Sequence, residues 1–219
     1  MLGAATVVLA AVLTGIATAA ATRPVLQALP EPVDQPEKLA YRSLSTRRFV
    51  LLCGVLAALA TVLAWHSVPL AARPLWLVLS TCGVLLAAID SKTTWLPLRL
   101  TQATWLLMVF ALATGVALGG GWQLLIRVAV GAVASGTLYF LGWLITRGGF
   151  GFGDVRFAPL LGAASAASSW RLLMWTLILG TAVGGLCGLL RLARRSRGPF
   201  PYAPSMLAGA YLAVALSWL

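Results

Sequence analysis

The sequence has little negative charge. Only 5 of its 219 residues are Asp or Glu, against 16 Lys and Arg, while 60% of the residues are hydrophobic. Soluble globular proteins carry about a quarter of their residues as charged side chains, and here the fraction is 10%. This composition excludes a soluble globular protein and indicates a chain that lies in a lipid bilayer.

Residues that bind metals are also scarce. His66 is the single histidine, and Cys53, Cys82 and Cys187 lie singly in apolar segments, without a C-x-x-C pair. Metal sites need several such ligands at short spacing. We therefore expect no metal site and no cofactor, and we interpret the cysteines as buried thiols rather than disulfide partners.

The net charge of +11 would suit a nucleic-acid partner, but the positive residues cluster in short loops between apolar runs. Basic residues in such loops are the usual topology signals of membrane proteins. We therefore expect the chain to be surrounded by the lipid bilayer and to bind no nucleic acid.

Apolar runs of about 16–24 residues recur along the chain, which is the length that a helix needs to cross a bilayer. The alternating pattern of a membrane β-barrel is absent. The sequence therefore predicts an all-α integral membrane protein, a polytopic bundle of about eight transmembrane helices. We expect these helices at about 3–21, 49–65, 74–90, 101–118, 122–145, 155–168, 171–190 and 204–219.

The first two predicted helices are joined by the one substantial polar stretch, residues 22–48. Four prolines and three of the five acids lie there, and the prolines argue against a helix in its first half. We expect residues 1–48 to form a first transmembrane helix plus a cytoplasmic loop rich in Pro and acids, and 49–219 to form a membrane-embedded domain. The small residues at 17–21 are typical of a signal-peptide cleavage region, but no basic residue precedes them, so we expect a retained helix.

The distribution of positive charge predicts the topology. The loops at 22–48, 91–100, 146–156 and 191–203 hold 5, 2, 2 and 4 positive residues, which is 13 of the 16. These four loops fall on one side of an eight-helix arrangement. The positive-inside rule therefore predicts that they are cytoplasmic and that both termini lie outside.

The two acids outside the polar loop are Asp90 and Asp154, each at the end of a predicted membrane helix. Ionisable residues at such positions are candidates for a functional site. The topology gives both the same membrane depth, and two neighbouring carboxylates cannot both ionise cheaply, so one holds a proton. Aspartic proteases use this arrangement: the carboxylate activates a water molecule and the acid polarises the scissile carbonyl group.

Asp154 closes a glycine-rich loop, Gly151-Phe152-Gly153-Asp154. The absence of side chains at Gly151 and Gly153 would let an extended substrate backbone approach Asp154 closely. Alternatively, the glycines form a flexible turn and Asp154 is the N-cap of the next helix. A separate glycine pattern, Gly180, Gly184 and Gly188, recurs every four residues and predicts a seam where helices pack closely.

Three segments resemble the type IV prepilin peptidases, which are membrane aspartic peptidases with a GxGD motif. In residues 88–101, Asp90 closes a helix and Pro97 follows seven residues later, as in the first active-site segment of that family. Residues 151–162 begin with the GxGD motif, and residues 200–210 are similar to the Pro-rich entry to the last helix. The resemblance covers roughly residues 75–215, all within the predicted domain 49–219.

The resemblance implies a GxGD peptidase domain with Asp90 and Asp154 as the catalytic pair, supported by Gly151, Gly153 and Pro97. The partner would be a prepilin or pseudopilin in the membrane, whose basic leader is removed after a glycine. The location would be the bacterial cytoplasmic (inner) membrane, multi-pass, with the active site at the cytoplasmic face. The sequence names no substrate-binding residue and no oligomeric state.

This chain departs from the family pattern at two positions. Leu98 stands where the family commonly has Asn, and Arg156 where Lys is common, which leaves details of substrate recognition open. Larger family members also carry a cytoplasmic domain with paired C-x-x-C zinc ligands that is associated with N-methylation. This chain has no such cysteines, so we expect cleavage without methylation and without zinc.

Two other functions are compatible with the Asp pair. A proton- or cation-coupled transporter also places carboxylates in a helical bundle, although usually near the bilayer midplane and with internal repeats. An inactive peptidase-like assembly protein would keep the fold without the activity. Removal of a prepilin leader would distinguish the peptidase from both.

Overall fold

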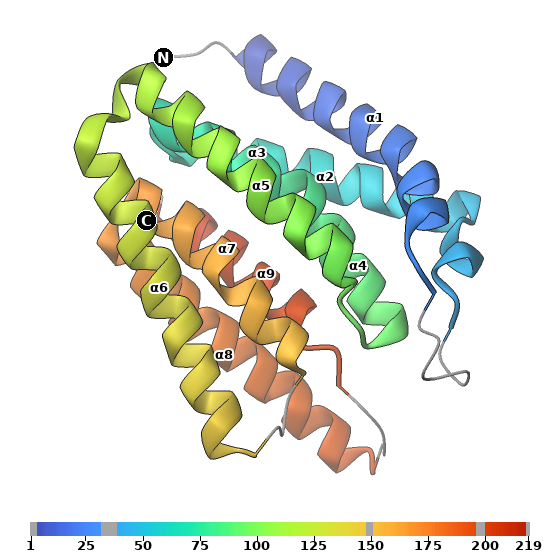
Figure 1. The fold of residues 1–219 in the computed structure, drawn as a ribbon. Coiled ribbons are helices and arrows are strands. Elements are labelled where there is room, and N and C mark those ends of the chain that lie inside the picture. The colour runs from blue at the N-terminus through green and yellow to red at the C-terminus, as the bar shows by residue number, and fades with distance from the viewer. Residues whose placement is uncertain (1–3, 32–38, 148–150, 196–199, 218–219) are drawn as a thin grey trace.

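Every element in the described part of the chain is helical. The computed structural model describes residues 4–31, 39–147, 151–195 and 200–217; residues 32–38 of the predicted cytoplasmic loop lie outside them. The α-helices are α1 (Ala4–Ala28), α2 (Arg47–Ser67), α3 (Arg73–Val78), α4 (Val84–Thr93), α5 (Leu98–Gly115), α6 (Gly121–Ile145), α7 (Phe152–Ser168), α8 (Trp170–Ala193) and α9 (Ala203–Leu216). Short helical turns, η1 (Tyr41–Leu44), η2 (Leu70–Ala72), η3 (Leu79–Gly83) and η4 (Val116–Gly120), join or extend them. The prediction of an all-α membrane protein is confirmed (Figure 1).

Five helical stretches in the described residues are long and apolar enough to cross a membrane: Ala4–Ala28, Arg47–Ser67, Leu70–Thr93, Leu98–Ile145 and Trp170–Ala193. The stretch Leu98–Ile145 bends at Gly119, where φ is 98°, a conformation that glycine adopts without a Cβ clash. It forms two arms, α5 and α6 (Figure 1). The shorter α7 and α9 complete the bundle, and the total of eight transmembrane helices stays a prediction.

The first helix is longer than predicted. The prolines of residues 22–48 suggested a non-helical start, but α1 continues to Ala28 with Pro24 inside it. A proline in a helix loses one backbone hydrogen bond. Here Leu26 is fully buried and Leu29 nearly so, so packing of this last part of α1 outweighs that loss.

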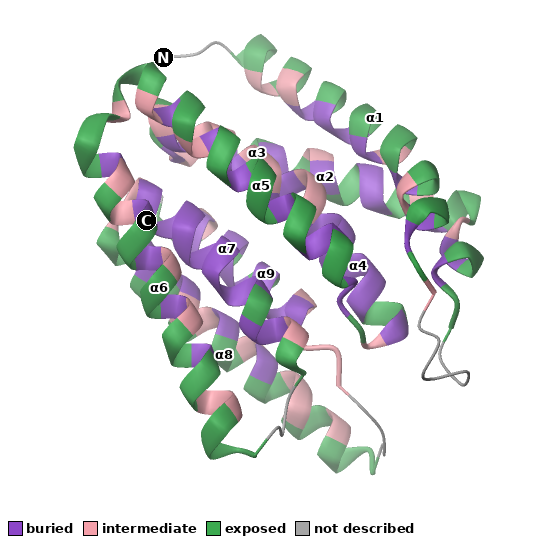
Figure 2. Cartoon of the chain, in the orientation of Figure 1, coloured by how far each residue is buried: buried purple, intermediate pink, exposed green. Residues whose placement is uncertain are grey.

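The buried core lies on α4, α7 and α9. From Asp154 to Ala167, every residue of α7 except Arg156 is buried, and Figure 2 shows the same concentration of buried residues on α4, α7 and α9. Much of the surface of α1, α5, α6 and α8 is exposed, as expected for helices that face lipid. The buried helices therefore lie where they can hold polar side chains away from the bilayer.

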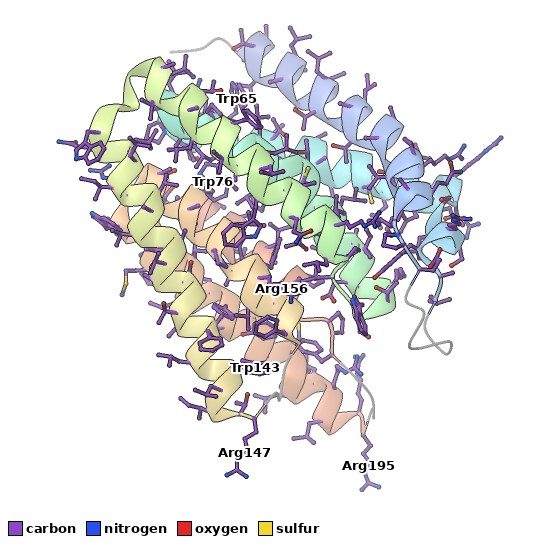
Figure 3. All side chains as sticks on the ribbon, viewed as in Figure 1. Trp65, Trp76, Trp143, Arg147, Arg156 and Arg195 are labelled. Atoms are coloured by element: carbon purple, nitrogen blue, oxygen red, sulfur yellow. The ribbon has the colours of Figure 1, made fainter. Side chains whose placement is uncertain are left out.

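The basic loops lie at one end of the bundle. The C-terminal ends of α1, α4, α6 and α8 are together there (Figure 1), and Arg147 and Arg195 extend from it (Figure 3). The N-terminus and the α5–α6 turn lie at the opposite end. This separation agrees with the grouping of the loops that the charges predict, while the cellular side that they face stays a prediction.

Candidate active site

Asp90 lies in the last turn of α4, with 4% of its surface exposed. The helix continues to Thr93, three residues beyond the predicted end, and stops at Thr94, whose φ is 54°. The backbone N–H of Thr94 donates to the carbonyl oxygen of Asp90 at 2.7 Å, as expected of a helix C-terminus with a left-handed cap. The Asp90 side chain therefore points from a well-defined helix end into the protein.

Asp154 is the third residue of α7 and is also 4% exposed. Its backbone N–H donates to the carbonyl oxygen of Gly151 at 3.0 Å, and its carboxylate accepts from the backbone N–H of Gly151. The bond from the Gly151 N–H to the Asp154 carboxylate is one half of a capping box, in which the third residue of the helix accepts from the N-cap amide. The N-cap is therefore Gly151, and the alternative that Asp154 itself is the N-cap is wrong.

The structure brings the two aspartates together at the N-terminus of α9, which packs against both α4 and α7. The backbone N–H of Ala203, the first residue of α9, donates to Asp90 Oδ2 at 3.2 Å. The same amide lies close to the Asp154 carboxylate, and the two carboxylates interact electrostatically. The N-terminus of α9 thus lies against both acids, and the amide donors of a helix N-terminus favour negative charge.

One carboxylate oxygen of the two aspartates can still accept a hydrogen bond. Asp154 Oδ1 is buried and has no hydrogen-bond partner among the described residues. An unpaired buried carboxylate oxygen costs free energy in a folded protein. Such a group at a functional site is suited to bind a water molecule or a polar group of a ligand.

The motif-supporting residues lie around this pair. A Cβ built on Gly153 would be 3.0 Å from the Leu96 Cβ, and one built on Gly151 would be 3.3 Å from Asp154 Oδ2. Gly153 therefore permits the first turn of α7 to pack on the loop that follows Asp90. Pro97, from that loop, is the N-cap of α5 and its carbonyl oxygen accepts from Thr101 N–H at 3.0 Å.

Two tyrosines beside the pair were not predicted. The hydroxyl groups of Tyr139 on α6 and Tyr202 at the N-cap of α9 hydrogen-bond to each other and to Thr181 on α8, and both rings are near enough to interact electrostatically with Asp154. Tyr202 lies in the Pro-rich segment 200–210, but the sequence predicts no role for this tyrosine. No sequence pattern marks Tyr139, because its contact depends on how α6 and α9 pack.

The predicted glycine seam on α8 is confirmed at two of its three positions. A Cβ on Gly180 would contact the Met206 backbone of α9 at 3.4 Å, and one on Gly184 would overlap the ring of Tyr202. No atom of the described residues lies within 4 Å of the corresponding point at Gly188. The prediction is wrong there, because α8 has passed beyond α9 at that turn.

An apolar groove lies between α2, α4 and α9. Its volume is about 320 Å³. Ser91 and Pro204, which directly follow Asp90 and Ala203 in sequence, are among its lining residues. Its apolar lining includes Leu56, Ala88, Leu207 and Ala208. A second groove, of about 410 Å³, lies between α5, α6 and α7, and neither aspartate lines either groove.

The site offers two carboxylates and no metal ligand set. Among the described residues there is no group of three or more His, Cys, Asp or Glu side chains that could hold a metal ion. The two buried carboxyl groups are suited to acid–base chemistry.

Comparison with known proteins agrees with this geometry. Residues 77–189, about half of the chain and the part that includes both aspartates, match the model of the type IV leader peptidase family. A search of curated proteins found no match, and neither did a search of solved structures. On the family match, the chain belongs to the type IV leader peptidase family.

Proposed function

We propose that this protein is a membrane aspartic endopeptidase that removes the basic leader peptide from prepilins or pseudopilins at the cytoplasmic membrane face. The observation that carries the proposal is that the backbone amide of Ala203 bonds Asp90 and lies beside Asp154. Two acids from distant parts of the sequence thereby share one buried site in a chain of a leader peptidase family.

The reaction needs both carboxyl groups. The ionised one accepts a proton from a water molecule as the water oxygen attacks the scissile carbonyl carbon, while the protonated one donates to the carbonyl oxygen. The tetrahedral intermediate then collapses and the C–N bond breaks: the second carboxylate takes back the proton from a hydroxyl group of the intermediate as the C=O bond re-forms, and the leaving amine takes a proton from the first carboxyl group. The unpartnered Oδ1 of Asp154 supports its part in holding the water.

The groove between α2, α4 and α9 supports a substrate that is partly in the membrane. Leu52, Leu56 and Leu59 on its α2 wall are 40–56% exposed, and its lining includes the residues next in sequence to Asp90 and Ala203. In our proposal the apolar segment that follows the cleavage site lies in this groove, and the leader extends to the basic end of the bundle. Exclusion of water from the groove would favour an apolar segment over a polar one.

Co-expression with a candidate prepilin tests the function. We expect a mobility shift of the substrate on a gel, and N-terminal sequencing should locate the new end after the leader. The variant with both Asp90→Asn and Asp154→Asn should leave the prepilin at full length. Cleavage that persists in this double variant, or no cleavage of any prepilin by the wild type, contradicts the proposal and favours an assembly protein or a transporter.

A further inference from the structure

We propose that Tyr202 is a positioning residue for the aspartate pair. Gly184 contributes to the site because, without a side chain, it leaves room for the Tyr202 ring. This inference rests on the proposed peptidase function. It concerns the peptide group between Tyr202 and Ala203, whose N–H donates to Asp90.

The two ends of this peptide group differ in how its own helix holds them. Ala203 is the first residue of α9, so its N–H has no partner within the helix, and Pro204, which follows, carries no N–H. The carbonyl oxygen of Tyr202 accepts from the N–H groups of Ser205 and Met206 at 3.0 and 3.2 Å. The helix therefore fixes the carbonyl end of this peptide group, and the side chain of Tyr202 is a second restraint on its orientation.

The Tyr202 side chain is held on three sides. Its ring lies over Gly184 of α8, its centroid is 6.2 Å from that of Tyr139 and 6.0 Å from that of Phe200, and its hydroxyl group bonds to Thr181 and Tyr139. A ring seated on a glycine and bonded at its far end has few rotamers left. This restraint passes directly to the next peptide group.

Gly184 is the residue of α8 against which the Tyr202 ring packs. A Cβ there would overlap the ring, whereas Gly185 and Gly188, on the same helix, have no atom of the described residues within 4 Å of a built Cβ. Gly184→Ala must therefore move the Tyr202 ring, while Gly185→Ala and Gly188→Ala meet open space. These two substitutions are matched controls, because all three make the same chemical change in one helix, where Ala is the better helix former.

The first test is the kinetics of leader cleavage with a purified prepilin in detergent. Small displacements of a catalytic group cost up to about a hundredfold in rate, so we expect Gly184→Ala and Tyr202→Ala each to lower kcat about tenfold or more. KM should change less than about twofold, because substrate contacts remain. Tyr202→Phe, which keeps the ring, should retain most of the activity, and both controls should cleave like the wild type.

The second test is a double-mutant cycle. If Gly184 acts through Tyr202, Gly184→Ala should cause no further loss of kcat once Tyr202 is Ala. The same cycle in thermal unfolding needs no substrate: relative to Gly185→Ala, Gly184→Ala should lower the Tm of the wild type, whereas in the Tyr202→Ala background the two substitutions should change the Tm equally.

Wild-type kcat in Gly184→Ala, or losses that multiply in the double variant, overturns the proposed role of Tyr202. A wild-type protein that cleaves no prepilin contradicts the proposed function instead, and the coupling in thermal unfolding then decides whether Gly184 and Tyr202 act together.

Discussion

Gly153, on the first turn of α7, packs against Leu96 in the loop after α4, and a Cβ at Gly153 would lie 3.0 Å from the Leu96 Cβ. This contact joins the segment that carries Asp154 to the segment that carries Asp90. The glycine of the GxGD motif therefore has a structural reason that does not involve substrate: it lets the two aspartate segments approach each other.

Gly153→Val should strongly lower leader cleavage, because its methyl groups would separate α7 from Leu96. In the variant that also carries Leu96→Ala, the space vacated by the leucine should restore part of the activity. Gly185→Val on α8, where the space is open, is the control and should cleave normally. If Leu96→Ala gives no recovery, the contact with Leu96 is not why Gly153 is needed.

Asp90→Asn and Asp154→Asn should each abolish leader removal while the protein still folds and inserts. Neither group alone supplies both the base and the acid, so the double variant should be no worse than either single one. Glu31→Gln is a suitable control: Glu31 accepts from the N–H groups of Tyr41 and Arg42 at 2.8 and 3.2 Å, away from the pair. Immunoblots of prepilin against mature pilin, with membrane fractionation, measure both properties. Near-wild-type cleavage by either single variant contradicts the mechanism.

Much of the site could be predicted from residues whose chemistry is unusual for their surroundings. Asp90 and Asp154 are the only acids outside the polar loop, and the glycines before Asp154 mark a turn, so the family and the pair followed from sequence. The contribution of Tyr139 and Tyr202 could not be predicted, since aromatic side chains are common in apolar helices and their contacts depend on packing. For the same reason the helical conformation of Pro24 was missed: the burial of Leu26 outweighs the local preference of proline.

The proposed substrate groove can be tested by filling it. Ala208 on α9 is exposed and lines the groove, so Ala208→Trp should block an apolar segment there and raise KM at least about fivefold for a full-length prepilin. Cleavage of a short leader peptide without that segment should be unaffected. Ala129→Trp places the same side chain in the second groove, where Ala129 is also exposed, and should change neither reaction. Equal KM values for the two variants would exclude the groove as a substrate site.

The orientation of the bundle can be measured with an impermeant thiol reagent in a variant that lacks Cys53, Cys82 and Cys187. Leu70→Cys introduces a thiol at a position that is 53% exposed, at the end of the bundle that we expect outside. Lys92→Cys and Arg194→Cys place thiols at the basic end. We expect labelling at position 70 in intact cells, and at 92 and 194 only after the membrane is opened. The reverse pattern would place the active site on the side opposite to a cytoplasmic prepilin leader.

The link between α1 and η1 predicts a pH dependence of stability. Burial raises the pKa of Tyr41 from 10.0 to about 12, and the Glu31 carboxylate adds to the rise. Because the folded protein holds the phenol proton more tightly than the unfolded chain, Tyr41 contributes stability that is fully present below about pH 10. This contribution is lost as the pH rises from about 10 to about 12, since the unfolded chain ionises first.

Thermal unfolding of the wild type and of Tyr41→Phe in detergent, between pH 8 and about 12, measures this contribution, because all other ionisable groups are common to both proteins. The difference in Tm should be constant up to about pH 10. Above that pH the wild type should lose Tm relative to Tyr41→Phe, which has no phenol proton to release. A difference that stays constant throughout would mean that Tyr41 ionises equally readily in the folded and unfolded chains, and that η1 does not bury its side chain in the way described.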